Sequence, residues 1–333
     1  MNWLITGGTG FIGSRLVNHL YKSNKGAIRI IDNLSVGSRK NLAETGSYRE
    51  ITAENLVGPP DGVELVVGDI RDADLALRAT QGIEAIVHLA GNTGVQPSIE
   101  DPLLDCSANV LGTLNYLEAA REHGITKFVF ASSGGTVIGD VTPPINEDMV
   151  PKPKSPYGAS KSACEGYLCA YHGTFGIETI ALRFGNVYGP GSDHKGSVVA
   201  KFIRQGLASE PLEIYGDGSQ TRDFVYIDDL IGAIVKAAYT PNIGGEVFQI
   251  ASNRETTISE IAKLISSLLS QAGVQGVQVQ HTNPLAGEIR RNFSDTSKAK
   301  QLLNWQATIG LTEGLKETIN WYLQTQTRTD DPV

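Results

Sequence analysis

The feature that most constrains the fold is a glycine-rich stretch close to the N-terminus. It reads Gly-Gly-Thr-Gly-Phe-Ile-Gly over residues 7–13, directly after the apolar run Trp3–Thr6 and directly before the apolar-periodic stretch Phe11–Lys22. Glycines at such a turn let the backbone approach a pyrophosphate closely, and the start of the helix offers free N–H groups. The pattern therefore predicts a dinucleotide site, although a plain surface turn can also use glycines. The residues that would form this site are Gly7, Gly10, Phe11, Ile12 and Gly13.

The first half of the chain alternates short apolar runs with helical periodicity. Runs typical of strands are residues 2–6, 27–31, 63–67, 85–89 and 127–131, and helical stretches lie near 11–22, 72–80 and 101–123. Apolar strands separated by helices indicate a parallel sheet that is covered on both faces. We therefore expect an α/β fold: a Rossmann-type doubly wound parallel sheet with a smaller irregular α/β substrate-binding lobe.

The pattern becomes less regular after about residue 177, where segments rich in Gly, Pro and charge alternate with helices. We expect residues 1–176 to form the dinucleotide-binding domain. Residues 227–250 should return to it, because they hold a helix followed by an apolar strand. Residues 177–226 and 251–325 would form the smaller lobe, and the polar end of the chain, 326–333, would be frayed.

Charge and apolar patterning narrow the possible partners. The net charge of −8 at pH 7 argues against a broad basic face for nucleic acid. No apolar run reaches the roughly 18 residues that a membrane span needs. The first residues also lack the basic-then-apolar order of a signal peptide. We expect neither a nucleic-acid partner nor a membrane partner.

The cysteines and histidines show no pattern of a disulfide framework or a metal site. Three cysteines are too few for a disulfide scaffold and are consistent with a reducing cytoplasm. We expect Cys164 and Cys169, which share one expected helix, to be buried thiols. No metal is expected, because the histidines lack ligand spacing. The residues considered are Cys106, Cys164, Cys169, His88, His123 and His172.

Acidic and apolar residues follow the other expected strands. Asp32 ends the second strand, 19 residues after the last glycine of the loop, where a carboxylate can bond the ribose hydroxyls of adenosine. Because a carboxylate there would repel the 2′-phosphate of NADP, NAD is favoured. Asp69 and Ile70 follow the third strand, where adenine could lie, and Leu89 and Ala90 follow the fourth, near the phosphates and the nicotinamide ribose. Each position is also consistent with an ordinary turn.

A second motif, Tyr-Gly-Ala-Ser-Lys over residues 157–161, indicates the chemistry. Tyr157 and Lys161 are four residues apart on an expected helix and therefore share one face. A free tyrosine has a pKa of about 10, and lowering it to about 7 takes roughly 4 kcal/mol. A neighbouring ammonium and an oxidised nicotinamide both favour the phenolate. Alone, such a pair is common on helix surfaces; beside the glycine loop it predicts a base and its partner.

Together these motifs resemble the extended short-chain dehydrogenase/reductase family, which includes NAD-dependent nucleotide-sugar epimerases and dehydratases. The likeness is greatest to the UDP-sugar 4-epimerases, and it extends to about Tyr322. It rests on residues 6–13, 32–34, 68–70, 88–90, 109–113, 157–161, 183–190, 215–218, 222–224 and 228–230.

The resemblance implies a role for residues at matching positions. Tyr157 would be the general base and Lys161 its partner, while Asn33, Asn109 and Ser132 would join the cofactor-binding residues.

The substrate side of the site is implied in the same way. Asn186 would bind the diphosphate of a nucleotide sugar, as would Arg222 and Arg290, whose guanidinium groups suit a diphosphate. We expect Arg291 to be an ordinary surface arginine. His194 and Lys195 lie in a loop that could also approach the substrate.

One segment departs from the family pattern. After the fifth expected strand the chain reads Ala-Ser-Ser-Gly-Gly-Thr-Val-Ile-Gly over residues 131–139. Many relatives carry Ser or Thr in place of Gly134, to bond the reacting hydroxyl, and Tyr in place of Ile138. We expect Ser133 to supply the catalytic hydroxyl and to contact the substrate, with Thr136 as the alternative. The Asp-Glu pair that dehydratases usually carry in this segment is also missing.

These residues favour 4-epimerisation of a sugar over 4,6-dehydration. A 4,6-dehydratase must also remove the C5 proton and protonate the leaving hydroxyl, which requires a further acid and base. A 4-epimerase only has to take the 4-hydroxyl proton onto Tyr157 while a hydride passes to NAD and then returns to the opposite face of the sugar. We therefore expect C4 inversion of a UDP-hexose of glucose, N-acetylglucosamine or glucuronate type. A dehydratase or decarboxylase of the same fold is the alternative, and a non-catalytic dinucleotide-binding protein is a distant one.

The resemblance further implies a cytoplasmic homodimer. Family members commonly pair through two long helices per subunit, here residues 101–123 and 156–175. The first of these carries an apolar stripe that equally fits packing on the sheet. The residues of that stripe are Leu104, Ala108, Leu111, Leu114 and Leu117.

Overall fold

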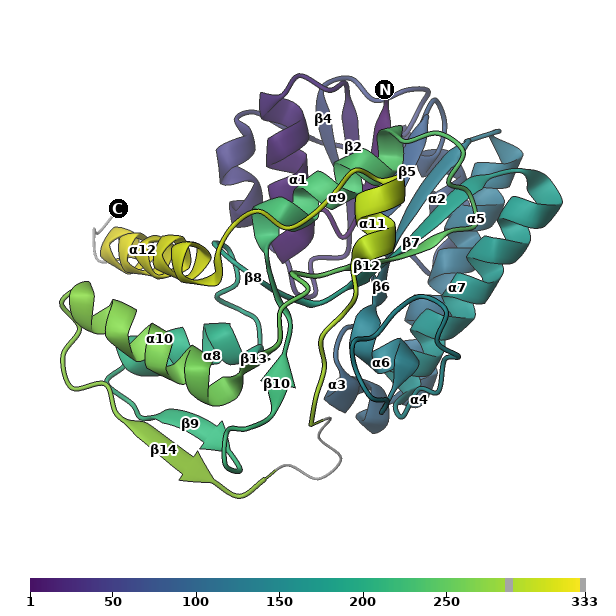
Figure 1. Cartoon of the computed structure of the whole chain (residues 1–333). Coiled ribbons are helices and arrows are strands. Elements are labelled where there is room, and N and C mark those ends of the chain that lie inside the picture. The colour runs from purple at the N-terminus through teal and green to yellow at the C-terminus, as the bar shows by residue number, and fades with distance from the viewer. Residues whose placement is uncertain (285–289, 330–333) are drawn as a thin grey trace.

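The computed structural model describes residues 1–284 and 290–329, with side chains up to residue 325. Its centre is a sheet of eight parallel strands in the order β12-β7-β6-β5-β1-β2-β4-β3 (Figure 1). The expected Rossmann-type sheet is confirmed. The strands are β1 (Trp3–Thr6), β2 (Ile28–Asp32), β3 (Arg49–Glu50), β4 (Val63–Val67), β5 (Ala85–His88), β6 (Lys127–Ser133), β7 (Glu178–Phe184) and β12 (Val247–Ile250).

The strand order reverses at the centre of the sheet. From β1 the chain builds outward through β2 and β4, and it then returns to the other side of β1 with β5, β6 and β7. Such a reversal leaves a crevice outside the carboxyl ends of the two central strands, because the connections that follow them leave in opposite directions. The glycine loop after β1 lies at this edge, which is where a dinucleotide is expected.

Helices cover both faces of the sheet, which explains why its central strands are apolar throughout. One core contains Ile5 and Ile30 and packs under α1 and α9, while the other contains Leu4 and Ile31 and packs under α2, α5 and α7. No helix in the described part of the chain is long and apolar enough to cross a membrane. These helices are α1 (Phe11–Lys22), α2 (Ala73–Ala79), α5 (Gly112–Glu122), α7 (Pro156–Phe175) and α9 (Ile227–Tyr239).

The smaller lobe consists of short strand pairs and helices that share the first of these cores (Figure 1). The strand pairs are β8 (Asn186–Tyr188) with β11 (Phe224–Tyr226), β10 (Thr221–Arg222) with β13 (Thr256–Thr257), and β9 (Leu212–Tyr215) with β14 (Val279–Thr282). The main helices are α8 (Val198–Leu207), α10 (Ile258–Gln271) and α12 (Leu311–Thr329). Because one core runs through both parts, the lobe is held firmly over the sheet.

Several boundaries differ from those that we expected. β7 is a strand of the main sheet, so the sheet-bearing part continues past residue 176 to Phe184, and β12 returns to it. The frayed end was expected from 326, but α12 continues to Thr329; residues 330–333 lie outside the described residues.

The helices also differ from those that we expected. The single helix expected at 101–123 is instead α4 (Pro102–Cys106), a π-helical segment (Ser107–Leu111) and α5. The unexpected elements are α3 (Val95–Glu100), α6 (Gly134–Ile138), α11 (Ser297–Leu302) and the 3-10 turns Arg39–Thr45 and Ala53–Asn55.

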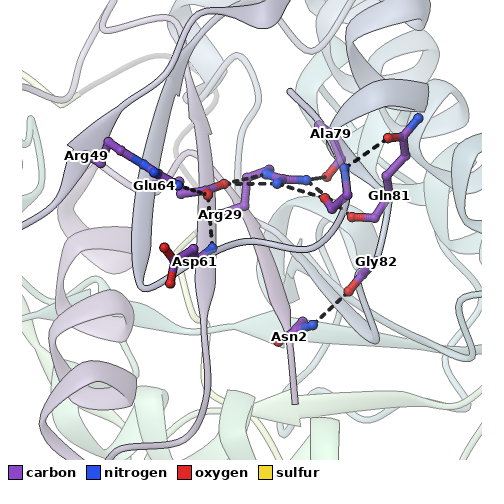
Figure 2. Close-up of polar contacts among 9 residues, drawn as sticks. Asn2, Arg29, Arg49, Asp61, Glu64, Ala79, Gln81 and Gly82 are labelled. Carbon is purple, nitrogen blue, oxygen red and sulfur yellow. Dashed lines mark hydrogen bonds and ion pairs between the residues drawn. The ribbon is translucent and has the colours of Figure 1, made fainter. Parts of the chain in front are cut away.

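A buried ion pair ties β2 to β4 at the edge of the sheet opposite the crevice (Figure 2). Arg29 donates from Nε to Glu64 at 3.0 Å, and its remaining N–H groups reach the carbonyls of Ala79, Gln81 and Gly58. Glu64 also accepts from Arg49 Nη2 at 2.9 Å. The guanidinium is well satisfied by the chain itself, so this cluster is structural and leaves no charge for a ligand.

Candidate active site

The glycine loop between β1 and α1 forms one wall of the site. Gly7 has a φ of +71°, and a Cβ on it would lie 2.8 Å from the backbone nitrogen of Ala90. A Cβ on Gly13 would lie 2.1 Å from the carbonyl oxygen of Gly7, so the packing excludes a side chain there. Gly10 differs, because a Cβ on it would approach only that same oxygen, at 3.3 Å. No side chain caps the first turn of α1. The looser packing at Gly10 than at Gly13, beside the uncapped N–H groups of the first turn of α1, fits a pyrophosphate.

Asp32 ends β2 beside this loop. Its carboxylate accepts the backbone N–H groups of Thr9 and Leu34, each at 2.9 Å, and the side chain is buried. Asp32 is therefore fixed against the loop and is not the solvated turn residue that was the alternative. Asn33 accepts the backbone N–H of Ser35 at 3.1 Å, which closes the turn after β2.

The residues after β4 and β5 lie along the same edge. Asp69 accepts Nε and Nη2 of Arg71 at 2.9 and 2.8 Å, and this guanidinium lowers the pKa of Asp69 to about 2. Ile70 is buried in the second core. Ala90 donates its N–H to Thr6 Oγ1 at 3.2 Å, and Leu89 packs on the first core. The structure thus brings the residues after β2, β4 and β5 to one edge.

Tyr157 and Lys161 lie in the first turns of α7. The helix begins at Pro156, where Ser155 Oγ accepts the N–H of Gly158 at 3.2 Å. Lys161 Nζ is 5.8 Å from the centre of the Tyr157 ring and 4.6 Å from that of Phe130. The Lys161 side chain is buried, and within the described residues it has no ion-pair partner.

The protein's own groups hold the phenol of Tyr157 protonated. Desolvation, and then the charge of Asp105, raise the pKa of Tyr157 to about 12, while desolvation lowers the pKa of Lys161. The ammonium of Lys161 alone therefore does not ionise the phenol; our expectation named an oxidised nicotinamide as the second positive charge. A further positive charge beside the phenol is required before it can act as a base near neutral pH.

A buried carboxylate that sequence reasoning missed lies behind the pair. Asp105 accepts Ser160 Oγ at 2.5 Å and Asn109 Nδ2 at 2.9 Å, and the second amide proton of Asn109 goes to the carbonyl of Asn92 at 3.0 Å. Both amide protons are therefore used, which fixes the direction of Asn109 Oδ1. This oxygen is buried and has no partner among the described residues.

The free oxygen of Asn109 points toward the cofactor side of the site. It lies 2.4 Å from the position of a Cβ on Gly91, and that same position is 3.7 Å from Lys161 Nζ. An orphaned acceptor beside an unpaired ammonium fits a ligand with hydroxyl donors, such as a ribose. The π-helical segment Ser107–Leu111 gives Asn109 this placement, since such segments shift the residues that follow by a fraction of a turn.

Ser132 lies at the end of β6, and its hydroxyl is engaged within the protein. It donates to Glu165 Oε1 at 2.6 Å, beside a buried ion pair in which Arg183 contacts both oxygens of Glu165 at 2.9 and 2.8 Å. Ser132 could therefore contact a cofactor through its backbone or as a hydroxyl acceptor, but not as a hydroxyl donor.

Ser133 and Thr136 lie beside the first turn of α7. Ser133 ends β6 and precedes α6, and its hydroxyl does not cap that helix. Thr136 Oγ1 is buried with no partner among the described residues. A Cβ on Gly158 would lie 2.1 Å from the carbonyl oxygen of Thr136, so α6 packs directly on the start of α7. The segment that carries both candidate hydroxyls thus packs against the helix turn that carries Tyr157.

Two amide side chains occupy the space left by the glycines of this segment. A Cβ on Gly134 would lie 2.8 Å from Gln249 Oε1, and one on Gly135 would lie 2.0 Å from Asn292 Nδ2. Gln249 is buried, its Oε1 accepts Ser294 Oγ at 3.2 Å, and its Nε2 has no partner among the described residues. Sequence reasoning missed both amides, because they come from segments more than 100 residues away along the chain.

The expected diphosphate residues lie in the smaller lobe. Asn186 begins β8, and its backbone N–H bonds the carbonyl of Asp223 at 2.8 Å. Arg222 lies in β10, directly after Thr221, whose N–H bonds the carbonyl of Arg290 at 2.8 Å. The structure therefore places the two arginines on adjoining segments. Arg291 pairs with Glu255 and is exposed, as expected.

Arg290 also lines a hollow of about 420 Å³. The rest of its lining comes from the turn after β9 and from Pro284. The charge of Arg290 contributes to the lowered pKa of Asp217, after the hydrogen bonds from Ser219.

The loop after β8 turns its two basic residues in different directions. His194 is exposed and lies 3.1 Å from Asp193. Lys195 is turned inward, where its Nζ donates to the carbonyl of Val187 at 3.2 Å.

His88, His123 and His172 have local hydrogen-bond partners, and one of the three cysteines, Cys164, is buried. His88 Nδ1 forms a hydrogen bond with Thr6 Oγ1, and burial lowers the pKa of His88 to about 3. His123 forms a hydrogen bond with Thr80, and His172 forms one with the carbonyl of Ile177. Within the described residues no group of three or more His, Cys, Asp or Glu could hold a metal. Cys164 is buried as expected, but Cys169 is exposed, because it lies on the outer face of α7.

The family model and the relatives that match this chain all point to one protein family. Residues 3–251 match a family model described as the NAD dependent epimerase/dehydratase family. A UDP-glucose 4-epimerase of Mycolicibacterium smegmatis is 39% identical over 97% of this chain and 98% of that protein. The structure of a Thermotoga maritima UDP-glucose 4-epimerase with UDP-glucose superposes with a TM-score of 0.87 at 34% identity, covering 98% of this chain and all of that one. The structure of a Bacillus cereus UDP-glucuronic acid 4-epimerase with UDP-glucuronic acid and NAD gives a TM-score of 0.84 at 31% identity, over 98% and 100% of the two chains.

Proposed function

The chain belongs to the NAD-dependent epimerase/dehydratase family, and on that premise we propose that it inverts C4 of a UDP-hexose through a transient 4-keto sugar. The observation that carries this proposal is the pair of Tyr157 and Lys161 on one turn of α7, beside two carboxylates, Asp105 and Glu165, that are both engaged in hydrogen bonds within the described chain. The sugar would be of the glucose, N-acetylglucosamine or glucuronate type.

NAD is the cofactor of this reaction, and when bound it accepts a hydride from C4 of the sugar and gives it back. The glycine loop and α1 would hold its pyrophosphate, and Asp32 its adenosine ribose. Asp69, Ile70, Leu89 and Ala90 would border the dinucleotide where the other strands end. Lys161 and the free oxygen of Asn109 would hold the ribose of the nicotinamide half.

Tyr157 would move the proton of the sugar's 4-hydroxyl. The phenol takes this proton in the oxidising step and returns it in the reducing step, so one group serves both directions. The Lys161 ammonium favours the phenolate, and the positive nicotinamide adds the charge that the buried phenol still requires. Ser133 would bond the same hydroxyl and hold it against the phenol, with Thr136 as the second candidate.

The carboxylates near Tyr157 argue against a dehydratase. Elimination requires a further acid and base at C5 and C6 of the sugar. The two carboxylates packed closest to this turn of α7 are Asp105 and Glu165, and both are buried and fully bonded within the protein. The segment after β6 contributes only Ser, Gly, Thr, Val and Ile over residues 132–139.

The substrate's diphosphate would be bound by Asn186, Arg222 and Arg290. Guanidinium groups suit it because their forked N–H groups can contact two phosphate oxygens at once. The hollow beside Arg290 and the turn after β9 would take the nucleoside.

We also propose a homodimer that forms through α3, α4, the π-helical segment and α7. These elements expose Leu103, Leu111 and Ile99 to 83%, 54% and 53%, and Tyr167 to 42%. Large apolar side chains exposed on helical segments that pack against one another are typical of a surface that a second copy covers. The expected cytoplasmic location stays a prediction.

The test of this function is turnover of a panel of UDP-sugars with separation of the C4 isomers. We expect the wild-type protein to interconvert at least one pair, and Tyr157→Phe to lose about 10²- to 10⁴-fold in kcat while still retaining NAD. Production of only a 4-keto-6-deoxy sugar or a pentose would contradict epimerisation. Full function in Tyr157→Phe would instead indicate a non-catalytic binding protein.

A further inference from the structure

Lys195 has surroundings that are unusual for a buried cation. Its Nζ donates to the carbonyl of Val187 at 3.2 Å and lies 4.9 Å from the centre of the Phe11 ring. Within the described residues it forms no ion pair. Burial, with no carboxylate to offset it, lowers the pKa of Lys195 to about 8. One carbonyl accepts one of the three ammonium protons, so two donors remain for another partner.

Most other partly buried lysines have a carboxylate partner. Lys127 pairs with Glu178, Lys201 with Glu213 and Lys298 with Glu246, whereas Lys25 lies over the ring of Tyr239. An ammonium that is removed from water without an anion is destabilising, so proteins rarely keep one without a reason. Lys161, which is more deeply buried, also has no such partner in the described chain, and we assign it to the cofactor ribose.

Lys195 lies between the two halves of the proposed site. Phe11 is the first residue of α1, where the pyrophosphate of the dinucleotide is expected. Val187 lies in β8, directly after Asn186, which is expected at the diphosphate of the nucleotide sugar. The loop packs on the start of α1, since a Cβ on Gly191 would lie 3.6 Å from the Phe11 ring.

The loop that carries Lys195 is held in place by its own hydrogen bonds. Ser192 Oγ donates to the carbonyl of Gly189 at 2.7 Å, and the N–H of Lys195 bonds the carbonyl of Ser192 at 3.0 Å. Arg204 of α8 donates to the carbonyls of Asp193 and Lys195 at 2.6 and 2.9 Å. The ammonium is therefore preorganised at this position before any ligand arrives.

We propose that Lys195 binds a diphosphate group, that of the nucleotide sugar or that of the dinucleotide. The inference rests on the proposed function, because both diphosphates belong to it. A compact ammonium suits phosphate oxygens as a point charge, whereas forked guanidinium groups such as those of Arg222 and Arg290 fix their orientation. The diphosphate would supply the anion that the chain itself does not place beside Lys195.

The test measures the binding of UDP, uridine and NAD by calorimetry, in the wild type and in Lys195→Gln and Lys195→Met. We expect both variants to bind the diphosphate ligand about ten- to a hundredfold more weakly, with uridine unaffected. Weakening for UDP alone assigns Lys195 to the nucleotide sugar, and weakening for NAD alone assigns it to the dinucleotide. Lys127→Gln is the matched control, because it removes a lysine that already has a carboxylate and lies at the start of β6, on the edge of the sheet opposite the crevice. It should bind all three ligands as the wild type does.

Thermal unfolding separates this role from a structural one. Without ligand, Lys195→Met should unfold at the wild-type temperature or above it, because an uncompensated cation has been removed. The same variant should gain less stability than the wild type from the diphosphate ligand. Lower stability without ligand combined with wild-type affinity for both UDP and NAD would overturn the proposal, as would an equal loss of uridine binding. Because no turnover is measured, a protein that binds UDP through Lys195 but epimerises no sugar would refute the proposed function alone.

Discussion

At the scale of single residues, the site consists of two reactive groups and the buried polar groups that hold them. In the proposed reaction Tyr157 and Lys161 would carry the chemistry, and the protonation of both depends on the groups that surround them. Asp105 is central to this, because its carboxylate bonds both Ser160 of α7 and the amide of Asn109. Its charge raises the pKa of Tyr157 and that of Lys161.

Asp105→Asn should move the pH dependence of turnover. Removing the negative charge lowers the pKa of Tyr157, so the phenolate persists to lower pH and the acid limb of kcat moves down by about one unit. The pKa of Lys161 also falls, so the basic limb moves in the same direction. The other titratable groups that face this pair, His88, Cys164 and Glu165, are unchanged in the variant. The measurement is kcat against pH.

Ser160→Ala is the matched control for that measurement. It removes the hydrogen bond to Asp105 and leaves the charge, so kcat falls while both limbs stay in place. Equal pH profiles for the wild type and Asp105→Asn would show that Asp105 has only a structural role.

At the scale of elements, the glycines of the loop between β1 and α1 differ in how tightly the protein packs around them. The packing of α1 against the loop excludes a side chain at Gly13, whereas at Gly10 a Cβ would make one tight contact, at 3.3 Å from the carbonyl oxygen of Gly7. A shift of a few tenths of an ångström would relieve that contact, so we expect the approach of a ligand to be the stronger reason for glycine at this position.

Gly10→Ala and Gly13→Ala should therefore fail in different ways. Gly13→Ala forces its Cβ against a backbone oxygen, and we expect a loss of at least about 1–3 kcal/mol in the free energy of unfolding. Gly10→Ala should unfold near the wild-type temperature but bind NAD about tenfold more weakly or worse. Thermal unfolding and NAD titration of both variants check this. Normal NAD affinity in a folded Gly10→Ala would place the pyrophosphate elsewhere.

The parts of the site that could be predicted from the sequence are those whose residues lie close together along the chain. The glycine loop, Asp32 and the turn that holds Tyr157 and Lys161 are local patterns, and each lies at the end of a strand or the start of a helix that periodicity identifies. Gln249 and Asn292 could not be predicted, because only the folded sheet brings them beside Gly134 and Gly135. The π-helical segment was not predicted either, because the apolar residues of 101–123 recur every three or four positions, as they would in an uninterrupted α-helix.

At the scale of the whole molecule, one core joins the sheet to the smaller lobe, so the two sides of the site are held in a fixed relation. The other side of the sheet presents an exposed apolar surface on α4, the π-helical segment and α7. Leu103, exposed to 83%, lies at the start of this surface and outside both cores.

Leu103→Asp should dissociate the proposed dimer without unfolding the subunit. The side chain is exposed in the monomer, so its change should alter the free energy of unfolding of a single subunit by no more than about 0.5 kcal/mol. A charge buried in a dimer interface without a partner is strongly unfavourable. Sedimentation of the wild type and the variant measures this, and Val150→Asp, an exposed apolar residue on a different segment, is the control. A wild type that sediments as a monomer at all concentrations would contradict the dimer.

The central claim is that Tyr157 and Lys161 serve a hydride transfer that begins and ends at C4 of a UDP-hexose. It is tested most directly with a UDP-hexose that carries deuterium at C4, with the product examined by NMR. We predict the C4 isomer with its deuterium still at C4, since the hydride that leaves is the one that returns. Deuterium at C6 of a 4-keto-6-deoxy sugar, or its loss to water, would contradict the account.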